Sequence, residues 1–187
     1  DPNVTDPADL DHATTLPAAT YSDPGWYERE RRAIFAATWQ LAGFRTHLRQ
    51  PGDYLTHAFA GFRILVVLNG AGELRAFHNV CRHRAGPLAT EPTGHCQVII
   101  CGYHGWTYRL DGTLKAVPDV RDFAGLEPAC RSLVPVRCGL LGNFIFVCED
   151  PQVESLEDFL EPVARFFRHL PLHDLRLVNQ RRVELAG

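Results

Sequence analysis

Two short segments of this 187-residue chain each place a cysteine close to a histidine. One residue separates Cys81 from His83, two separate Cys101 from His104, and seventeen lie between the two pairs. Two thiolates and two imidazoles are ligands that suit zinc or an iron–sulfur centre. The sequence therefore predicts a metal centre held by these four side chains.

The order of the four ligands distinguishes two kinds of metal centre. A Cys2His2 zinc site groups its ligands as Cys-x-x-Cys and His-x3–5-His, with the second pair on a helix. In a bridged two-iron cluster with mixed ligands, the two cysteines hold one iron and the two histidines hold the other. Two loops that each offer one cysteine and one histidine meet this requirement. The spacing favours the cluster, and a zinc-stabilised interaction module is the less favoured alternative.

The residues around the four ligands resemble the Rieske domain of the non-haem iron oxygenases. The resemblance is strongest in Asn79–Arg84 and Cys101–Tyr108, and it extends from about Tyr21 to Val147. This family includes aromatic ring-hydroxylating dioxygenase α subunits, oxidative demethylases and monooxygenases. The resemblance implies a Rieske-type 2Fe–2S cluster and a mainly β fold.

Several neighbouring residues separate this chain from the respiratory Rieske proteins. Those proteins carry two extra cysteines that form a disulfide, where this chain has Gly86 and Tyr103. Trp106 replaces a serine that donates a hydrogen bond to a cluster sulfide, whereas Tyr108 keeps the aromatic hydroxyl. Fewer hydrogen bonds to sulfur lower the potential, so we expect a value on the order of −150 mV. One departure from the oxygenases is Ala85, where many members have a glycine directly after the arginine.

Four residues near the ligands are expected to support the cluster. Arg82 and Arg84 are either surface charges or residues that offset the reduced cluster's charge and attract an acidic electron donor. Tyr103 and Trp106 are expected to pack around the loops and shield the sulfides from water.

Apolar periodicity predicts a small all-β domain flanked by an N-terminal and a C-terminal helix. The resemblance implies that this domain is an antiparallel β-sandwich of Rieske type with two cluster-binding hairpin loops. We divide the chain into an arm and helix (1–38), a 2Fe–2S domain (39–150), and a helix and strand leading into a missing catalytic domain (151–187). The predicted helices begin at Asp23-Pro24 and near Ser155. The predicted strands are Trp39–Phe44, Asp53–Phe59, Phe62–Leu68, Leu74–Asn79, Gln97–Ile100, Trp106–Leu110, Thr113–Val117, Val134–Cys138, Asn143–Cys148 and Leu175–Leu185.

Composition excludes several classes of protein. A net charge of −3 and a pI near 6.3 do not suggest nucleic-acid binding. No apolar run approaches the ~18 residues of a membrane span, and no signal peptide is present. Six cysteines in such a chain do not suggest a disulfide framework, so we expect a cytoplasmic protein. The chain begins at Asp1 and contains no methionine, which favours a processed or excised piece.

The expected function is one-electron transfer within an oxygenase. By resemblance, a reductase or ferredoxin supplies electrons, and a mononuclear Fe(II) in the missing catalytic domain uses them for O2-dependent hydroxylation or demethylation of a small organic substrate, as in aromatic hydrocarbon catabolism. The resemblance also implies a homotrimer or a related oligomer. No catalytic residue is expected in this chain, because His169 and His173 are interpreted as surface histidines. A stand-alone Rieske-type ferredoxin is the alternative function.

Overall fold

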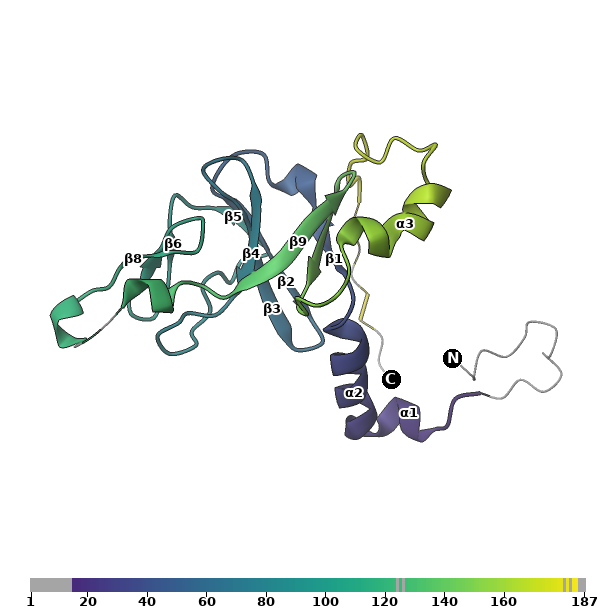
Figure 1. The fold of residues 1–187 in the computed structure, drawn as a ribbon, viewed down its shortest axis with the longest axis horizontal. Coiled ribbons are helices and arrows are strands. Elements are labelled where there is room, and N and C mark those ends of the chain that lie inside the picture. The colour runs from purple at the N-terminus through teal and green to yellow at the C-terminus, as the bar shows by residue number, and fades with distance from the viewer. Residues whose placement is uncertain (1–14, 124, 126, 180, 182, 185–187) are drawn as a thin grey trace.

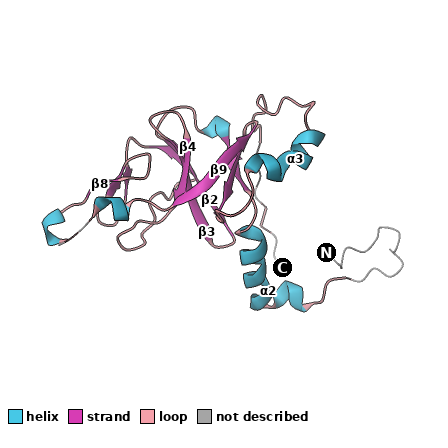
Figure 2. Cartoon of the chain, viewed as in Figure 1, coloured by secondary structure: helices cyan, strands magenta, loops and turns pink. Residues whose placement is uncertain are grey.

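The large sheet of this protein is antiparallel and has seven strands, and a smaller three-stranded sheet lies at one end of it (Figure 1). The computed structural model describes residues 15–123, 125, 127–179, 181 and 183–184. The strand order is β1-β10-β9-β4-β3-β2-β5 in the large sheet and β6-β7-β8 in the small one. Helices lie at the periphery of the strands (Figure 2). The predicted mainly β class, flanked by an N-terminal and a C-terminal helix, is confirmed.

The described elements follow one another along the chain in a simple order. The strands are β1 Gln40–Phe44, β2 Asp53–Phe59, β3 Phe62–Leu68, β4 Leu74–His78, β5 Thr93–His95, β6 Ile99–Ile100, β7 Thr107–Tyr108, β8 Leu114–Ala116, β9 Pro135–Leu141 and β10 Phe144–Cys148. The helices are α1 Ala19–Ser22, α2 Pro24–Glu30, the π-helix η2 Arg31–Phe35, the 3-10 helices η3 Arg45–His47, η4 Val120–Asp122 and η5 Pro128–Arg131, and α3 Leu156–Phe166.

Strand β3 separates two hydrophobic cores. Side chains alternate between the faces of a strand, so Ile64, Val66 and Leu68 enter the core of the large sheet. Leu65 and Val67 point the other way and pack in the core that also contains the cysteines of both candidate loops. All five side chains are buried, and each burial contributes roughly 1.5–3 kcal/mol. The strand therefore attaches the small sheet and both loops to the large sheet.

The N-terminal helix begins where the sequence predicts. Asp23 caps α2, and its Oδ1 accepts a hydrogen bond from the Gly25 amide at 2.8 Å. The π-helix continues α2 to Phe35, three residues short of the predicted end at Thr38. The short helix α1 was not predicted, because four residues are too few to show a helical period. Residues 1–14 of the predicted N-terminal arm lie outside the described part of the chain.

The C-terminal helix also follows its predicted capping pattern. Ser155 caps α3 by accepting a hydrogen bond from the Asp158 amide at 3.1 Å. The helix continues through Pro162 to Phe166 and packs Leu156 and Leu160 against the sheet. Over the described residues, no helix combines the length and the apolarity that a membrane crossing demands.

Apart from shifts in strand bounds, one strand was not predicted and one predicted strand is absent from the described residues. Strand β5 was missed because Thr-Gly-His has no alternating apolar pattern, and only its pairing with β2 makes it a strand. The predicted strand Leu175–Leu185 is wrong for its described residues, which form no strand. The start of this segment is held instead by the side chain of Asn143, which donates a hydrogen bond to the Leu175 carbonyl at 2.9 Å. Apolar alternation cannot create a strand where no neighbouring strand offers its backbone.

Candidate metal centre

The two loops that carry the predicted ligands have the same backbone hydrogen bonds. The first loop follows β4 and the second connects β6 to β7. In the first, the Cys81 amide donates to the Gly86 carbonyl at 2.8 Å, and the Cys81 carbonyl accepts from the Ala85 amide at 3.1 Å. The second loop repeats both bonds around Cys101, each at 2.9 Å. The predicted matching loops are therefore present.

Both loops also adopt a left-handed backbone at the fourth residue after the cysteine. The φ angle is +55° at Ala85 and +70° at Gly105. Glycine adopts this conformation without steric cost, whereas a Cβ atom makes it unfavourable. This explains physically why a glycine suits the position after Arg84, where the present sequence departs from the usual pattern.

The two cysteine sulfurs lie in the buried interior of the site. Cys81 is 3% exposed and Cys101 is 2% exposed. Burial raises the pKa of the Cys81 thiol, a hydrogen bond with Tyr108 acts in the opposite direction, and the neighbouring Cys101 thiol raises the pKa further. Two adjacent thiolates in a buried environment are unfavourable without a positive charge beside them. A metal ion supplies this charge, because cysteine binds metals as the thiolate.

The buried Tyr108 hydroxyl is directed at the cysteine sulfur. Its Oη lies 3.3 Å from Cys81 Sγ and accepts a hydrogen bond from the Arg82 amide at 3.1 Å. Since the amide occupies an acceptor position, the hydroxyl proton is available to the sulfur. The pKa of Tyr108 is raised mainly by burial, so the hydroxyl keeps this proton.

The two histidines form the outer half of the site. The rings of His83 and His104 lie 4.7 Å apart between centroids, and both are partly exposed. His83 stacks on Trp106 at 5.0 Å with an interplanar angle of 2°, and Phe123 meets its edge at 5.8 Å. Burial, then His104 and Arg84, lower the pKa of His83, which favours the neutral imidazole that binds metals. Among the described residues, nothing hydrogen-bonds the buried His83 Nδ1.

The residues that were predicted to support the cluster differ in their burial. Trp106 is buried against His83, as expected of a packing residue. Tyr103 is 65% exposed, and its ring lies 3.9 Å from that of His104, so it covers an imidazole at the surface. The side chains of Arg82 and Arg84 are exposed beside the first loop.

Two further residues hold the site together and were missed as site residues in the sequence. The buried Asn79 closes the first loop, because its Oδ1 accepts from the Leu88 and Ala89 amides at 3.0 Å and its Nδ2 donates to the Ala89 carbonyl at 2.7 Å. An asparagine directly before the cysteine segment was the available signal. Phe123 packs on Trp106 at 5.7 Å from a separate segment, and no local pattern indicated it.

The donor atoms form two pairs. In the described residues, no three His, Cys, Asp or Glu side chains converge on a point where one metal ion could bind. A bridged two-iron cluster needs only two protein ligands for each iron. A buried thiol pair, an adjacent imidazole pair and an unpaired ring nitrogen fit such a cluster.

A comparison with protein families agrees with this geometry. Residues 38–136 match the model of the Rieske [2Fe-2S] domain, which is more than half of the chain. The chain therefore belongs to the Rieske 2Fe–2S family.

Its relatives are oxygenase subunits. Choline monooxygenase of Spinacia oleracea is 35% identical over 143 residues, which are 76% of this chain and 32% of that protein. The carnitine monooxygenase oxygenase subunit of Escherichia coli is 34% identical over 172 residues, or 91% of this chain and 46% of the relative. The chain thus spans about a third to a half of the length of these relatives.

Solved structures show the same architecture. A quaternary ammonium Rieske monooxygenase in complex with L-carnitine has a TM-score of 0.81 and 32% identity, and covers 88% of this chain and 47% of its own. Naphthalene 1,2-dioxygenase has a TM-score of 0.74 and 32% identity, covering 79% and 34%. The antiparallel fold with two matching loops is therefore that of the Rieske oxygenases.

Proposed function

We propose that this chain transfers single electrons as the Rieske portion of an oxygenase. In this proposal Cys81 and Cys101 bind one iron of the cluster, and His83 and His104 bind the other. When bound, the cluster supplies reversible one-electron redox chemistry. The pairing of thiol with thiol and imidazole with imidazole is the observation that carries the assignment.

The residues of the chain have separate tasks in this transfer. Tyr108 donates a hydrogen bond to Cys81 Sγ, which stabilises added negative charge. The buried thiols are kept from water, whereas the partly exposed histidines present an edge at which an electron can enter or leave. The exposed Arg82 and Arg84 place positive charge beside this edge, which suits an acidic reductase or ferredoxin.

The substrate is proposed from the relatives alone. Their names specify choline, carnitine and glycine betaine, which all carry a trimethylammonium group. We therefore favour oxygenation of a quaternary ammonium compound, including its oxidative demethylation, over aromatic hydrocarbon catabolism. A mononuclear iron site outside this chain, a homotrimeric assembly and a cytoplasmic location belong to the same proposal. A solved relative described as showing inter-subunit electron transfer supports an oligomer.

Metal analysis of the chain and its variants tests the ligand assignment. Reconstituted protein should contain about two irons and two sulfides per chain. Cys101→Ala should lose them, whereas Cys96→Ala, five residues earlier, should keep them. A coloured Cys101→Ala protein with full iron content would contradict the assignment. Stoichiometric zinc in a colourless protein would instead support an interaction module.

A further inference from the structure

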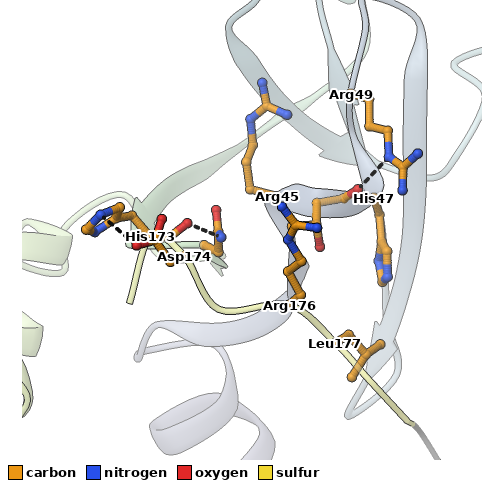
Figure 3. A pocket seen from close by; sticks show the side chains of 9 residues that line it. Arg45, His47, Arg49, His173, Asp174, Arg176 and Leu177 are labelled. Carbon is orange, nitrogen blue, oxygen red and sulfur yellow. Dashed lines mark hydrogen bonds and ion pairs between the residues drawn. The ribbon is translucent and has the colours of Figure 1, made fainter. Parts of the chain in front are cut away.

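A second concave site lies away from the cluster loops. It is a pocket of about 870 Å3 between η3, the turn that joins β9 to β10, and the segment that follows α3 (Figure 3). None of its lining residues belongs to either cluster loop. The pocket is therefore a feature that electron transfer does not explain.

Asn143 holds the walls of this pocket together. Its carbonyl accepts from the Arg45 amide at 2.8 Å, and its amide donates to the Leu172 carbonyl at 3.1 Å. Its side chain donates to the carbonyls of His173 and Leu175, the latter at 2.9 Å. These bonds fix a segment without secondary structure against the turn, so the pocket has a defined shape.

A glycine in the same turn permits this close approach. Gly142 has a φ angle of +57°, and a Cβ atom there would lie 2.5 Å from Leu172 Cβ and 2.8 Å from its carbonyl oxygen. Any larger residue would push the segment away.

The lining of the pocket is strongly basic. Arg45 and Arg49 come from one wall and Arg176 from the other (Figure 3). Arg45 is half-buried, and in the described part of the chain neither its guanidinium nor that of Arg176 has an acceptor. Among the described residues, the guanidinium of Arg49 donates a hydrogen bond only to the Thr46 carbonyl, at 3.4 Å. A partly buried cation without a counter-charge is unfavourable, so an anion in the pocket would be stabilised.

The acidic groups of the pocket do not balance these charges. Asp174 is the single acid in the lining, and its carboxylate lies 3.4 Å from His173 Nε2. The lining thus contains three arginines and one aspartate, in a protein whose net charge is −3. Positive charge is therefore concentrated at this pocket, although the net charge of the chain is negative.

We propose that this pocket binds a small anion that carries two or more phosphate or carboxylate groups. Guanidinium groups bind either oxyanion in a bidentate manner, and arginines on two walls can hold two such groups at once. The concave shape suits a small molecule better than a flat protein surface. This inference goes beyond the proposed electron transfer and does not depend on it.

Calorimetric titration of the chain with pyrophosphate, and separately with citrate, tests the proposal. We expect saturable binding of at least one of the two anions, and this binding should weaken as salt is added. The anion that binds more tightly shows whether the pocket prefers phosphate or carboxylate groups. The double variant Arg45→Gln, Arg176→Gln should bind at least about tenfold more weakly. The control Arg165→Gln removes an exposed arginine of α3, which pairs with Glu161 at 3.8 Å, and should leave binding unchanged.

A single variant and three defined results complete the test of the anion site. The single variant Arg176→Gln changes only an exposed side chain, so it keeps the test valid if the double variant unfolds, and it should also weaken binding. The proposal is overturned if neither anion binds, if the folded variants bind as tightly as the parent, or if Arg165→Gln weakens binding equally.

Discussion

At the residue scale, the Tyr108 hydroxyl on β7 contacts the first loop at two atoms, Cys81 Sγ and the Arg82 amide nitrogen. We predict that Tyr108→Phe lowers the reduction potential. Losing one hydrogen bond of about 1 kcal/mol that favours the reduced state corresponds to a shift on the order of 50 mV. Protein-film voltammetry measures this shift, and Tyr27→Phe on the exposed face of α2 is the matched control. An unchanged potential in Tyr108→Phe would show that the hydroxyl does not act on the cluster.

A second residue-scale prediction concerns backbone strain in the first loop. Ala85 has a φ angle of +55°, which disfavours any residue with a Cβ atom. Ala85→Gly should therefore raise the free energy of unfolding by about 1 kcal/mol. Ala116→Gly in β8, where the backbone is extended, should lower it by a similar amount. Chemical denaturation of the cluster-loaded protein compares the two variants, and equal destabilisation by both would contradict the strain argument.

At the element scale, Asp53 ties the start of β2 to its surroundings. Its Oδ2 accepts from the Arg49 and Gln50 amides at 2.8 and 3.0 Å, and its Oδ1 lies 2.9 Å from His95 Nδ1 on β5. Burial alone would raise the pKa of Asp53, but the hydrogen bonds from His95 and the two amides outweigh it and lower the pKa. The ionised carboxylate therefore stabilises the fold.

This lowered pKa sets the direction of a pH dependence. A carboxyl whose folded-state pKa lies below its unfolded value near 3.9 stabilises the protein fully above that value. The contribution is lost as the pH falls through the lower folded-state pKa. Asp53→Asn should cost about 1 kcal/mol at pH 7 and should reduce the loss of stability below about pH 4. Denaturation curves from pH 7 to 3 measure this, with Glu157→Gln as the control, and an unaltered acid profile in Asp53→Asn would contradict the assignment.

A second element-scale prediction concerns the attachment of α3. The Arg137 guanidinium on β9 donates to the carbonyls of Asp150, Val153 and Glu154, and lies 4.8 Å above the Trp39 ring. Lysine cannot reproduce this planar, multiple donor set. Arg137→Lys should therefore lower the free energy of unfolding by roughly 1–2 kcal/mol.

Hydrogen exchange distinguishes a local effect from a general one for Arg137→Lys. Amides at the start of α3 should lose protection first, while those of β3 keep it. Arg75→Lys is the control and should change little, because this arginine is exposed and, among the described residues, pairs only with Glu73, at 2.7 Å. Uniform loss of protection over the sheet would contradict a role in docking the helix.

At the scale of the whole molecule, the proposed function gives this chain only the electron-transfer part of an oxygenase reaction. Over the described residues, no three potential ligands converge to hold a separate mononuclear iron. We predict that the cluster-loaded chain is reduced by a suitable reductase or ferredoxin but oxidises no choline, carnitine or glycine betaine, even with ferrous iron supplied. Product analysis after incubation with O2 measures this. Turnover by the chain alone would require an iron site that the described residues do not contain.

The sequence by itself determined the two loops and most strands, because these depend on local spacing and period, and it predicted the four ligands from the same spacing. Cys81 and His83 predict one loop, and Cys101 and His104 predict the other. The structure places the two loops side by side, so that it contradicts none of the four predicted ligand positions. Strands β2 and β3 match their predicted bounds because their apolar residues are regular and glycines end them. Family comparison independently confirmed the Rieske class.

Only the tertiary structure decided the features that depend on contacts between distant segments. Strand β5 exists through its pairing with β2, whereas the described residues of 175–184 form no strand despite their apolar alternation. Phe123 contacts His83 from forty residues away, and Arg176 lines the same pocket as Arg45 only because Asn143 holds the two segments together. Local pattern carries no information about these approaches, since the burial and hydrogen bonds that stabilise them arise only when the chain has folded.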